Sequence, residues 1–314
     1  MWTRRSLLRG GIAAGASLLM PRTALATTDA LTLALAGEPP QLYPTAGNDP
    51  LTEAVAYQNL FEGLIRIDQG GKVQPCLAKS WEISPDGLAY TFALQSDVRY
   101  HDGTSFDAGH VVFSLNRLTS AQSQSPLRAL YAAISGVAAV DDATVRLSLR
   151  EPDGKLLFNL GRGDAAMVAP ESADNNRTVP IGTGPFAFMQ WDAGQQIVVV
   201  RNEDYWGTHP RLNEVTIVFA PDPQPAIAAL LAGTIEGYPN FPEPAALAGV
   251  RGNPAVQVIE GVGPDGKRRV GVWNSGLLGM WANAPLEGCV LADIRWKDDS
   301  GAPQPAAPPA GGGD

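Results

Sequence analysis

The apolar residues between positions 30 and 232 switch repeatedly between a strand period of two and a helix period of about 3.6. Leu31, Leu33 and Leu35 share one strand face and precede a helix-like apolar stretch over 51–65. Further strand or helix patterns follow at 90–94, 111–118, 145–149, 197–200, 215–219 and 225–231. Asp107 is the expected N-cap of the helix at 111–118, and Gly233 is the expected stop of the last helix. This order predicts an α/β chain with no internal repeat.

Composition removes several other classes of protein. The chain has 314 residues, of which 45% are hydrophobic and 18% charged, so it can bury a sizeable core. Its net charge of −9 argues against binding to nucleic acid, because a protein that binds nucleic acid needs a basic face. No apolar stretch approaches the roughly 20 residues needed to span a bilayer as a helix. Length alone suggests about two domains.

The first 26 residues have the pattern of an export signal. Arg4 and Arg5 precede an uncharged stretch over 10–21, and Ala24-Leu25-Ala26 offers small residues to a signal peptidase. The paired arginines are similar to a twin-arginine signal, which predicts a periplasmic protein; the alternative is an uncleaved N-terminal helix. Cleavage would remove four arginines and change the net charge from −9 to −13.

Two other features bear on domain organisation. In an oxidising compartment Cys76 and Cys289 could pair, but two separate buried thiols are the favoured interpretation, because the sequence gives no distance between them. Residues 298–314 contain no aromatic or branched aliphatic side chain and are expected to form a solvated tail. The predicted organisation is therefore a signal over 1–26, a folded region over 27–297 and a tail over 298–314.

Two segments carry a family resemblance. Residues 86–118, DGLAYTFALQSDVRYHDGTSFDAGHVVFSLNRL, and residues 180–207, PIGTGPFAFMQWDAGQQIVVVRNEDYWG, resemble signature segments of the family 5 extracellular solute-binding proteins. These are the peptide, nickel and opine receptors of ABC importers. Residues 53–67 and 226–237 also resemble family elements. The resemblance implies a lobe with a mixed sheet like those of type II periplasmic binding proteins, no enzymatic activity, and an ABC permease as partner.

The resemblance ends near residue 260. Family members continue into a second α/β lobe, whereas here residues 267–273 (KRRVGVW) and 285–296 (PLEGCVLADIRW) follow, the latter similar to a returning strand of the first lobe. We therefore expect one composite lobe, with the second lobe largely absent. Capture of a small solute such as a peptide is the expected function; a shortened lobe that binds no solute, and acts as an interaction protein or has no function, is the alternative.

By analogy with the family, certain residues are expected to touch a ligand. They follow the first strand, begin the next helix, or lie after the last helix: Tyr43, Tyr57, Tyr238, Asn240, Phe241 and Trp273. Aromatic rings there would offer apolar area with a polar tip. The alternative for each is ordinary packing at a lobe edge.

Other chemistry has little support. His101, His110 and His209 are too dispersed for a recognised zinc signature, although a nickel site assembled in space stays open. The segment Gly182-Thr183-Gly184-Pro185 lacks the Lys-Ser/Thr of a phosphate loop. No nucleophile elbow is present. We expect no catalytic residue, no metal and no cofactor.

Overall fold

The computed structural model describes residues 30–68, 71–262 and 268–274. The expected export signal over 1–26, the strand over 285–296, the tail over 298–314 and Cys289 lie outside the described residues. They therefore stay predictions.

The larger of the sheets has seven strands in the order β12-β13-β11-β1-β10-β9-β8. Strand β1 is parallel to β10 and β11, and the other neighbouring pairs are antiparallel, so the sheet is mixed as predicted. The strands are β1 (Ala30–Leu35), β8 (Phe186–Asp192), β9 (Gln196–Arg201), β10 (Glu214–Phe219), β11 (Gly237–Tyr238), β12 (Val256–Val262) and β13 (Arg268–Asn274).

A second, antiparallel sheet has four strands in the order β4-β5-β7-β6, and a small hairpin pairs β2 with β3. These strands are β2 (Ile65–Ile67), β3 (Val73–Pro75), β4 (Ala78–Ile83), β5 (Ala89–Leu94), β6 (Ile134–Asp141) and β7 (Thr144–Leu149). The helices are α1 (Pro50–Ala56), α2 (Ala108–Thr119), α3 (Leu156–Leu160) and α4 (Pro223–Ala232), with short 3-10 turns η1 (Pro44–Ala46), η2 (Arg128–Tyr131), η3 (Gly163–Ala165) and η4 (Pro244–Gly249).

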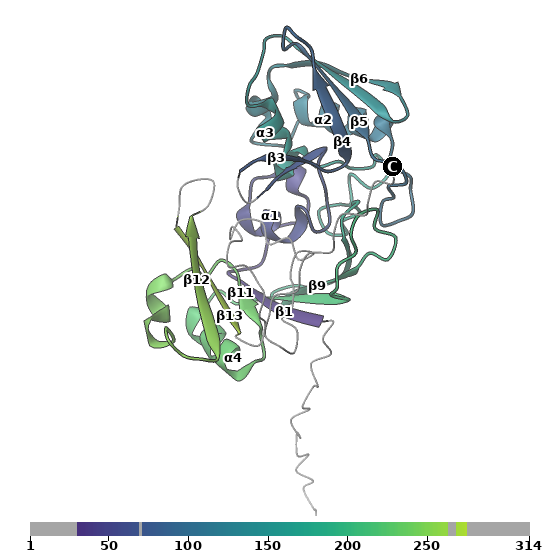
Figure 1. Ribbon diagram of the computed structural model, residues 1–314. Helices are drawn as coiled ribbons and strands as arrows, with labels where there is room; N and C mark the ends of the chain where they lie inside the picture. Colours follow the sequence, from purple (N-terminus) through teal and green to yellow (C-terminus); the bar gives the residue numbers. More distant parts are fainter. Residues whose placement is uncertain (1–29, 69–70, 263–267, 275–314) are drawn as a thin grey trace, which may run out of the picture.

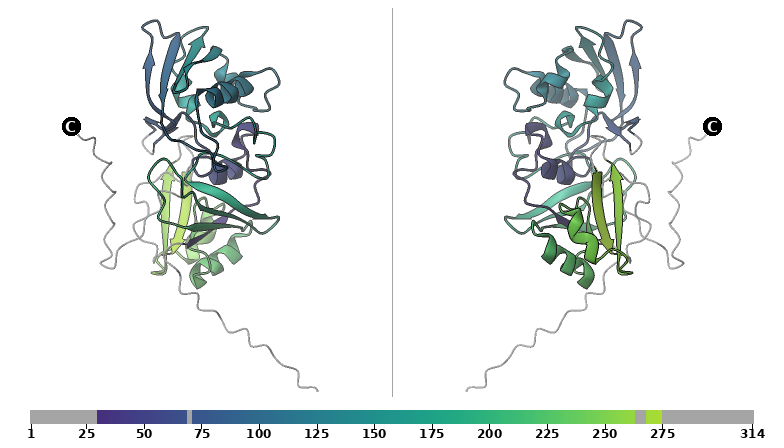
Figure 2. Two further views of the ribbon diagram at one scale, coloured as in Figure 1. Left: turned by 90° about the vertical axis from the view of Figure 1, so that its right-hand side faces the viewer. Right: turned by 90° about the vertical axis from the view of Figure 1, so that its left-hand side faces the viewer.

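The chain crosses between the two sheets twice. It leaves the seven-stranded sheet after β1, builds the four-stranded sheet with α2, and returns at β8. Figure 1 shows the two sheets at opposite ends of the folded part of the molecule, with α1 between them, and the side views of Figure 2 agree. The four-stranded sheet is thus an insertion into a lobe whose main sheet is made by β1 and the later part of the chain.

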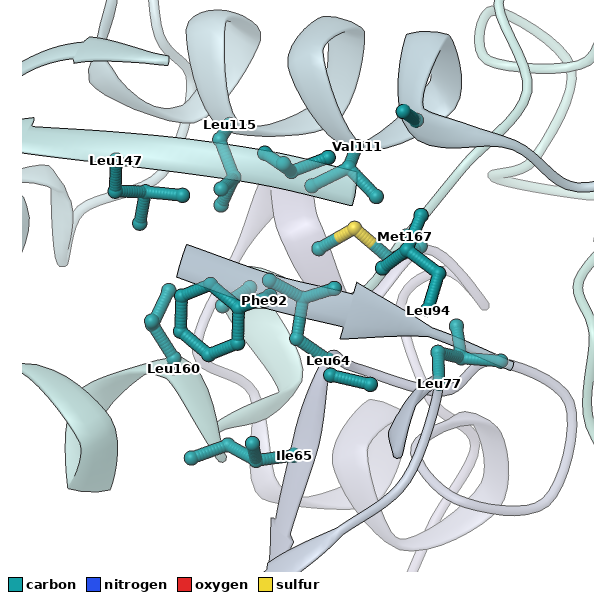
Figure 3. Close-up of a cluster of buried hydrophobic side chains, with 14 of the residues drawn as sticks. Leu64, Ile65, Leu77, Phe92, Leu94, Val111, Leu115, Leu147, Leu160 and Met167 are labelled. Atoms are coloured by element: carbon teal, nitrogen blue, oxygen red, sulfur yellow. The ribbon is translucent and has the colours of Figure 1, made fainter. Parts of the chain in front are cut away.

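Each face of the main sheet has its own core. One cluster joins Leu31, Leu33 and Ile217 to the segment around α1, and another packs α4 and Val272 on the opposite face. A third cluster fills the space between the four-stranded sheet and α2 (Figure 3), where Val111 and Leu115 of α2 lie over the side chains of β5. The alternation of apolar residues predicted the faces of these strands correctly.

The helix ends show where local patterns succeed. Asp107 caps α2, because its carboxylate accepts the backbone N–H of His110, and the His110 side chain completes a reciprocal capping box. Gly233 ends α4 in the left-handed region with φ of 70°. Both boundaries match the sequence-based prediction.

The helix predicted over 51–65 is wrong in its second half, since α1 ends at Ala56. Gln58 has a φ of 61°, which breaks the helix, and the Asn59 amide donates to the carbonyls of Ala54 and Val55. The carbonyls of Asn59 and Leu60 instead accept from the backbone N–H groups of Phe186 and Gly184. Long-range backbone pairing thus replaces the local helix.

Within the part of the chain that the structure describes, no helix is long and apolar enough to cross a membrane. The architecture is the mixed α/β lobe that the sequence predicted.

Candidate functional site

The six residues expected to touch a ligand lie mostly inside the protein. Five of them are at most 5% exposed: Tyr43, Tyr57, Tyr238, Phe241 and Trp273. Asn240 alone is half-buried. Contact with a ligand therefore stays a prediction for all six.

The structure divides these residues between two faces of the main sheet. Gly237 pairs with Trp273 and Tyr238 pairs with Val272 in the β11–β13 ladder, so the side chains of Trp273 and Tyr238 point in opposite directions. Trp273 joins Tyr43 and Tyr57 in one core cluster, while Tyr238 and Phe241 stack in the other with ring centres 5.0 Å apart. One ligand-binding surface cannot contain all six side chains without rearrangement.

Hydrogen bonds separate structural from unsatisfied members of this set. The Tyr57 hydroxyl donates to the Gly161 carbonyl, and the Tyr238 hydroxyl donates to the Ala220 carbonyl. Both hydrogen bonds are 2.8 Å long. Among the described residues, the Tyr43 hydroxyl, Asn240 Oδ1 and Trp273 Nε1 are buried without a hydrogen-bond partner. Buried polar atoms are normally paired, so these three atoms are the ones in the set that could still form a hydrogen bond.

Two hollows flank η1, where the chain passes from the main sheet to the inserted unit. One has a volume of about 20 Å³ and is bordered by Tyr43, Ser114, Arg117 and Gln124. The other has a volume of about 100 Å³ and is bordered by residues of the η1 loop, the first turn of α1, Arg162 and Asp164. Since one water occupies roughly 10–15 Å³ on this measure, only the second hollow has room for a small polar group.

Two arginines hold the loop that separates these hollows. The Arg177 carbonyl accepts from Leu42 N–H at 2.8 Å, and its guanidinium donates to the side-chain oxygens of Gln41 and Gln124. The Arg117 guanidinium lies 5.6 Å from the centre of the Tyr43 ring, a cation–π geometry. The η1 loop is thereby tied to α2 and to the segment around residue 124.

The junction between the two units is organised by a buried carboxylate that the sequence reasoning missed. Glu62 is 3% exposed and accepts four side-chain hydrogen bonds. Its Oε2 accepts from Thr183 Oγ1 and Trp206 Nε1, both at 2.9 Å, and its Oε1 accepts from Tyr205 hydroxyl at 2.8 Å and Cys76 Sγ at 3.6 Å. Burial raises the pKa of Glu62, and these donors oppose the shift. An acidic residue inside the apolar run 60–65 was the available signal.

His101 makes a second link to the Gly182–Pro185 segment. The Gly182 N–H donates to His101 Nδ1 at 3.2 Å, and His101 Nε2 lies 3.1 Å from the Gly184 carbonyl, which accepts its proton. Burial lowers the pKa of His101 to about 4. The ring is therefore neutral at neutral pH and serves as a structural bridge.

Gly182 and Gly184 lie directly against the backbone of the segment after α1. A Cβ added at Gly182 would stand 2.0 Å from the Leu60 carbonyl oxygen, and one at Gly184 would stand 2.3 Å from that of Asn59. Close backbone approach, not phosphate binding, explains both glycines.

Replacing Gly184 by alanine is expected to lower the free energy of unfolding by about 1–3 kcal/mol, because the backbone must shift to admit the methyl group. Urea denaturation followed by circular dichroism measures the effect. Gly136→Ala is the matched control, since a Cβ at Gly136 meets no atom within 4 Å. Equal stabilities of the two variants would contradict the close-approach explanation.

Among residues 30–68, 71–262 and 268–274, no group of three or more His, Cys, Asp or Glu side chains is arranged to hold a metal ion. Cys76 is buried beside Glu62, and burial raises the pKa of its thiol well above the ordinary value.

Comparison with known proteins identifies relatives that match about two thirds of this chain. The model of the "Bacterial extracellular solute-binding proteins, family 5 Middle" matches residues 72–278. Heme-binding protein A of Haemophilus influenzae is 32% identical over 230 residues, covering 65% of this chain and 42% of the relative. Glutathione-binding protein GsiB of Pectobacterium atrosepticum is 31% identical over 218 residues, covering 68% and 41%.

Solved structures with the same fold include two ligand complexes. A periplasmic binding protein DppA of Helicobacter pylori with the peptide STSA has a TM-score of 0.68 and 28% identity, covering 74% of this chain and 51% of that one. NikZ of Campylobacter jejuni with Ni(L-His) has a TM-score of 0.68 and 27% identity, covering 75% and 48%.

The chain spans less than half the length of these two curated relatives. The family is one of non-enzymatic binding proteins, in agreement with the expectation of no enzymatic activity. Since its model covers about two thirds of the sequence, and the mixed lobe superposes on solved members, this chain belongs to the family 5 bacterial extracellular solute-binding proteins.

Proposed function

We propose that this chain is the exported receptor of a peptide-type ABC importer and captures a small solute for a permease in the inner membrane. The match of the family model over residues 72–278 is the observation that carries the proposal. The twin-arginine pattern of residues 1–26 supports delivery to the periplasm. A two-lobed receptor closes on its solute, so a partner surface opposite this lobe is part of the proposed mechanism.

Isothermal titration calorimetry of the chain without residues 1–26 tests solute capture. The panel consists of the ligand classes bound by relatives: the peptide STSA, glutathione, heme, agropinic acid and Ni(L-His). We expect saturable heat from one class. No heat from any of them would reject capture of these ligand classes by this chain.

A second candidate function is an interaction protein that binds no solute. The burial of the expected ligand contacts favours it, because five of the six side chains are at most 5% exposed and offer little surface to a solute. This candidate predicts a cooperative thermal transition that the ligand panel leaves unchanged, and a protein partner recovered by crosslinking in the periplasm. A ligand-induced rise in melting temperature would contradict it.

A further inference from the structure

The larger hollow beside η1 has the features of a built polar site. Its volume is about 100 Å³, and its walls come from the η1 loop, the first turn of α1 and the η3 segment. Such a space holds several waters or one small polar group. It lies entirely within one lobe and needs no second lobe to exist.

A buried carboxylate with an unused oxygen lines this cavity. The Asp164 side chain is only 2% exposed, and its Oδ2 accepts from Ser125 Oγ at 3.5 Å. Its Oδ1 has no hydrogen-bond partner among the described residues. Burial raises the pKa of Asp164, and the Arg162 guanidinium opposes the shift. A buried acceptor without a hydrogen bond is costly.

An unused donor lies next to the unused acceptor. Arg162 Nε is 3.5 Å from Asp164 Oδ1, close enough for an ion pair, yet Nε makes no hydrogen bond within the described part of the chain. A ligand that both donates and accepts hydrogen bonds would satisfy the two atoms together. A purely apolar group would satisfy neither.

The charge around the cavity favours a cation. Three carboxylates line the cavity, those of Asp49, Glu53 and Asp164. The lining contains one guanidinium, that of Arg162. Asp49 Oδ1 already accepts from the backbone N–H groups of Leu51 and Thr52. Glu53 Oε1 lies 3.4 Å from the point that a Cβ of Gly163 would occupy. Because Gly163 has no side chain, the Glu53 carboxylate can lie close to η3, as a second carboxylate beside that of Asp164.

We propose that this cavity binds the ammonium group of a small solute that carries an oxygen acceptor on the neighbouring carbon, as in a 1,2-amino alcohol. The ammonium donates to Asp164 Oδ1 and to the Glu53 carboxylate, and the solute oxygen accepts from Arg162 Nε. The inference rests on the proposed solute capture, because it names a chemical feature of the captured solute.

Ethanolamine is the probe, compared with ethylamine, which lacks the oxygen, and with ethylene glycol, which lacks the charge. Chemical shifts of the isotope-labelled chain are followed during titration. We expect saturable binding of ethanolamine, about tenfold weaker binding of ethylamine through loss of one charge-assisted hydrogen bond, and no saturation by ethylene glycol.

Variants assign the roles. Asp164→Asn is expected to weaken ethanolamine binding at least tenfold, and Arg162→Met to abolish the preference for ethanolamine over ethylamine. Glu53→Gln provides a second test of the acidic side if Asp164→Asn does not fold. Asp174→Asn is the matched control, because the Asp174 side chain is 96% exposed and pairs with Arg117 outside the cavity.

The failures of the two proposals differ. A panel solute that binds, while ethanolamine does not saturate, overturns the cavity assignment and leaves solute capture standing. Ethanolamine binding that depends on Asp164 or Glu53, without heat from any panel solute, supports the cavity and rejects capture of those classes. Equal binding of ethylene glycol, or an affinity unchanged in both acidic variants, overturns the inference and leaves a cavity that holds only water.

Discussion

Glu62→Gln is expected to lower the free energy of unfolding by roughly 2–6 kcal/mol, the largest effect of any conservative substitution that we predict. The amide offers one oxygen where the carboxylate offers two, so one pair of donors loses its acceptor. The pair is either Thr183 and Trp206 or Tyr205 and Cys76. Each orphaned buried donor costs about 1–3 kcal/mol. Urea denaturation measures the loss.

Glu82→Gln is the matched control, because Glu82 lies on β4 and is exposed. It should leave the denaturation midpoint unchanged. Tyr205→Phe combined with Glu62→Gln tests the specific contact. The double variant should be less destabilised than the sum of the single variants, because without the Tyr205 hydroxyl the introduced amide can turn its NH2 group to that side and orphan one donor fewer. A Glu62→Gln midpoint equal to that of the control would refute the role assigned to this carboxylate.

Acidification from pH 6.5 to pH 4 is expected to weaken the fold through His101. Its pKa is about 4 in the folded chain against 6.5 ordinarily, so in this interval the unfolded state binds a proton that the folded state refuses. The stabilisation is complete above pH 6.5, declines as the pH falls, and is exhausted below about 4. Its size is roughly 2–3 kcal/mol, the lower figure allowing for the partial exposure of the ring.

His101→Gln isolates this contribution. Glutamine can accept from Gly182 N–H and donate to the Gly184 carbonyl, as the ring does, but it does not titrate. The difference in unfolding free energy between the original chain and this variant should shrink by roughly 2–3 kcal/mol between pH 7.5 and pH 4. The exposed His209→Gln serves as control. A difference that does not change with pH would refute the assignment.

The stability of the original chain must be compared with that of His101→Gln at each pH, because other buried groups change the stability with pH in the opposite direction. Burial raises the pKa of both Glu62 and Asp164. The folded state therefore takes up protons on these groups more readily than the unfolded state, and their contribution grows as the pH falls. Total stability near pH 4 combines both trends, while the comparison with His101→Gln cancels the carboxyl groups.

The predictable parts of the fold depend on neighbours in sequence. Alternating apolar residues defined β1, β5, β7 and β10, and Asp107 and Gly233 marked helix ends. The prediction over 51–65 failed after Ala56, where backbone groups pair with residues 184 and 186. Apolar periodicity carries no information about a partner more than 100 residues away.

The candidate site was harder to predict for the same reason. Analogy placed Tyr238 and Trp273 together, whereas the pairing of β11 with β13 turns them to opposite faces. The partners of Glu62 come from positions separated from it by 14, 121, 143 and 144 residues. The cavity at Arg162 and Asp164 likewise forms only where η1 and η3 meet.

The sequence by itself determined the α/β class, the faces of several strands, two helix ends and the family, because periodicity, caps and motifs act within a few residues of one another. Only the tertiary structure decided which polar groups meet: the donors around Glu62, the bridge at His101 and the unused pair at Arg162 and Asp164. These depend on backbone crossings between two sheets, where burial makes each unpaired atom costly and each pairing specific.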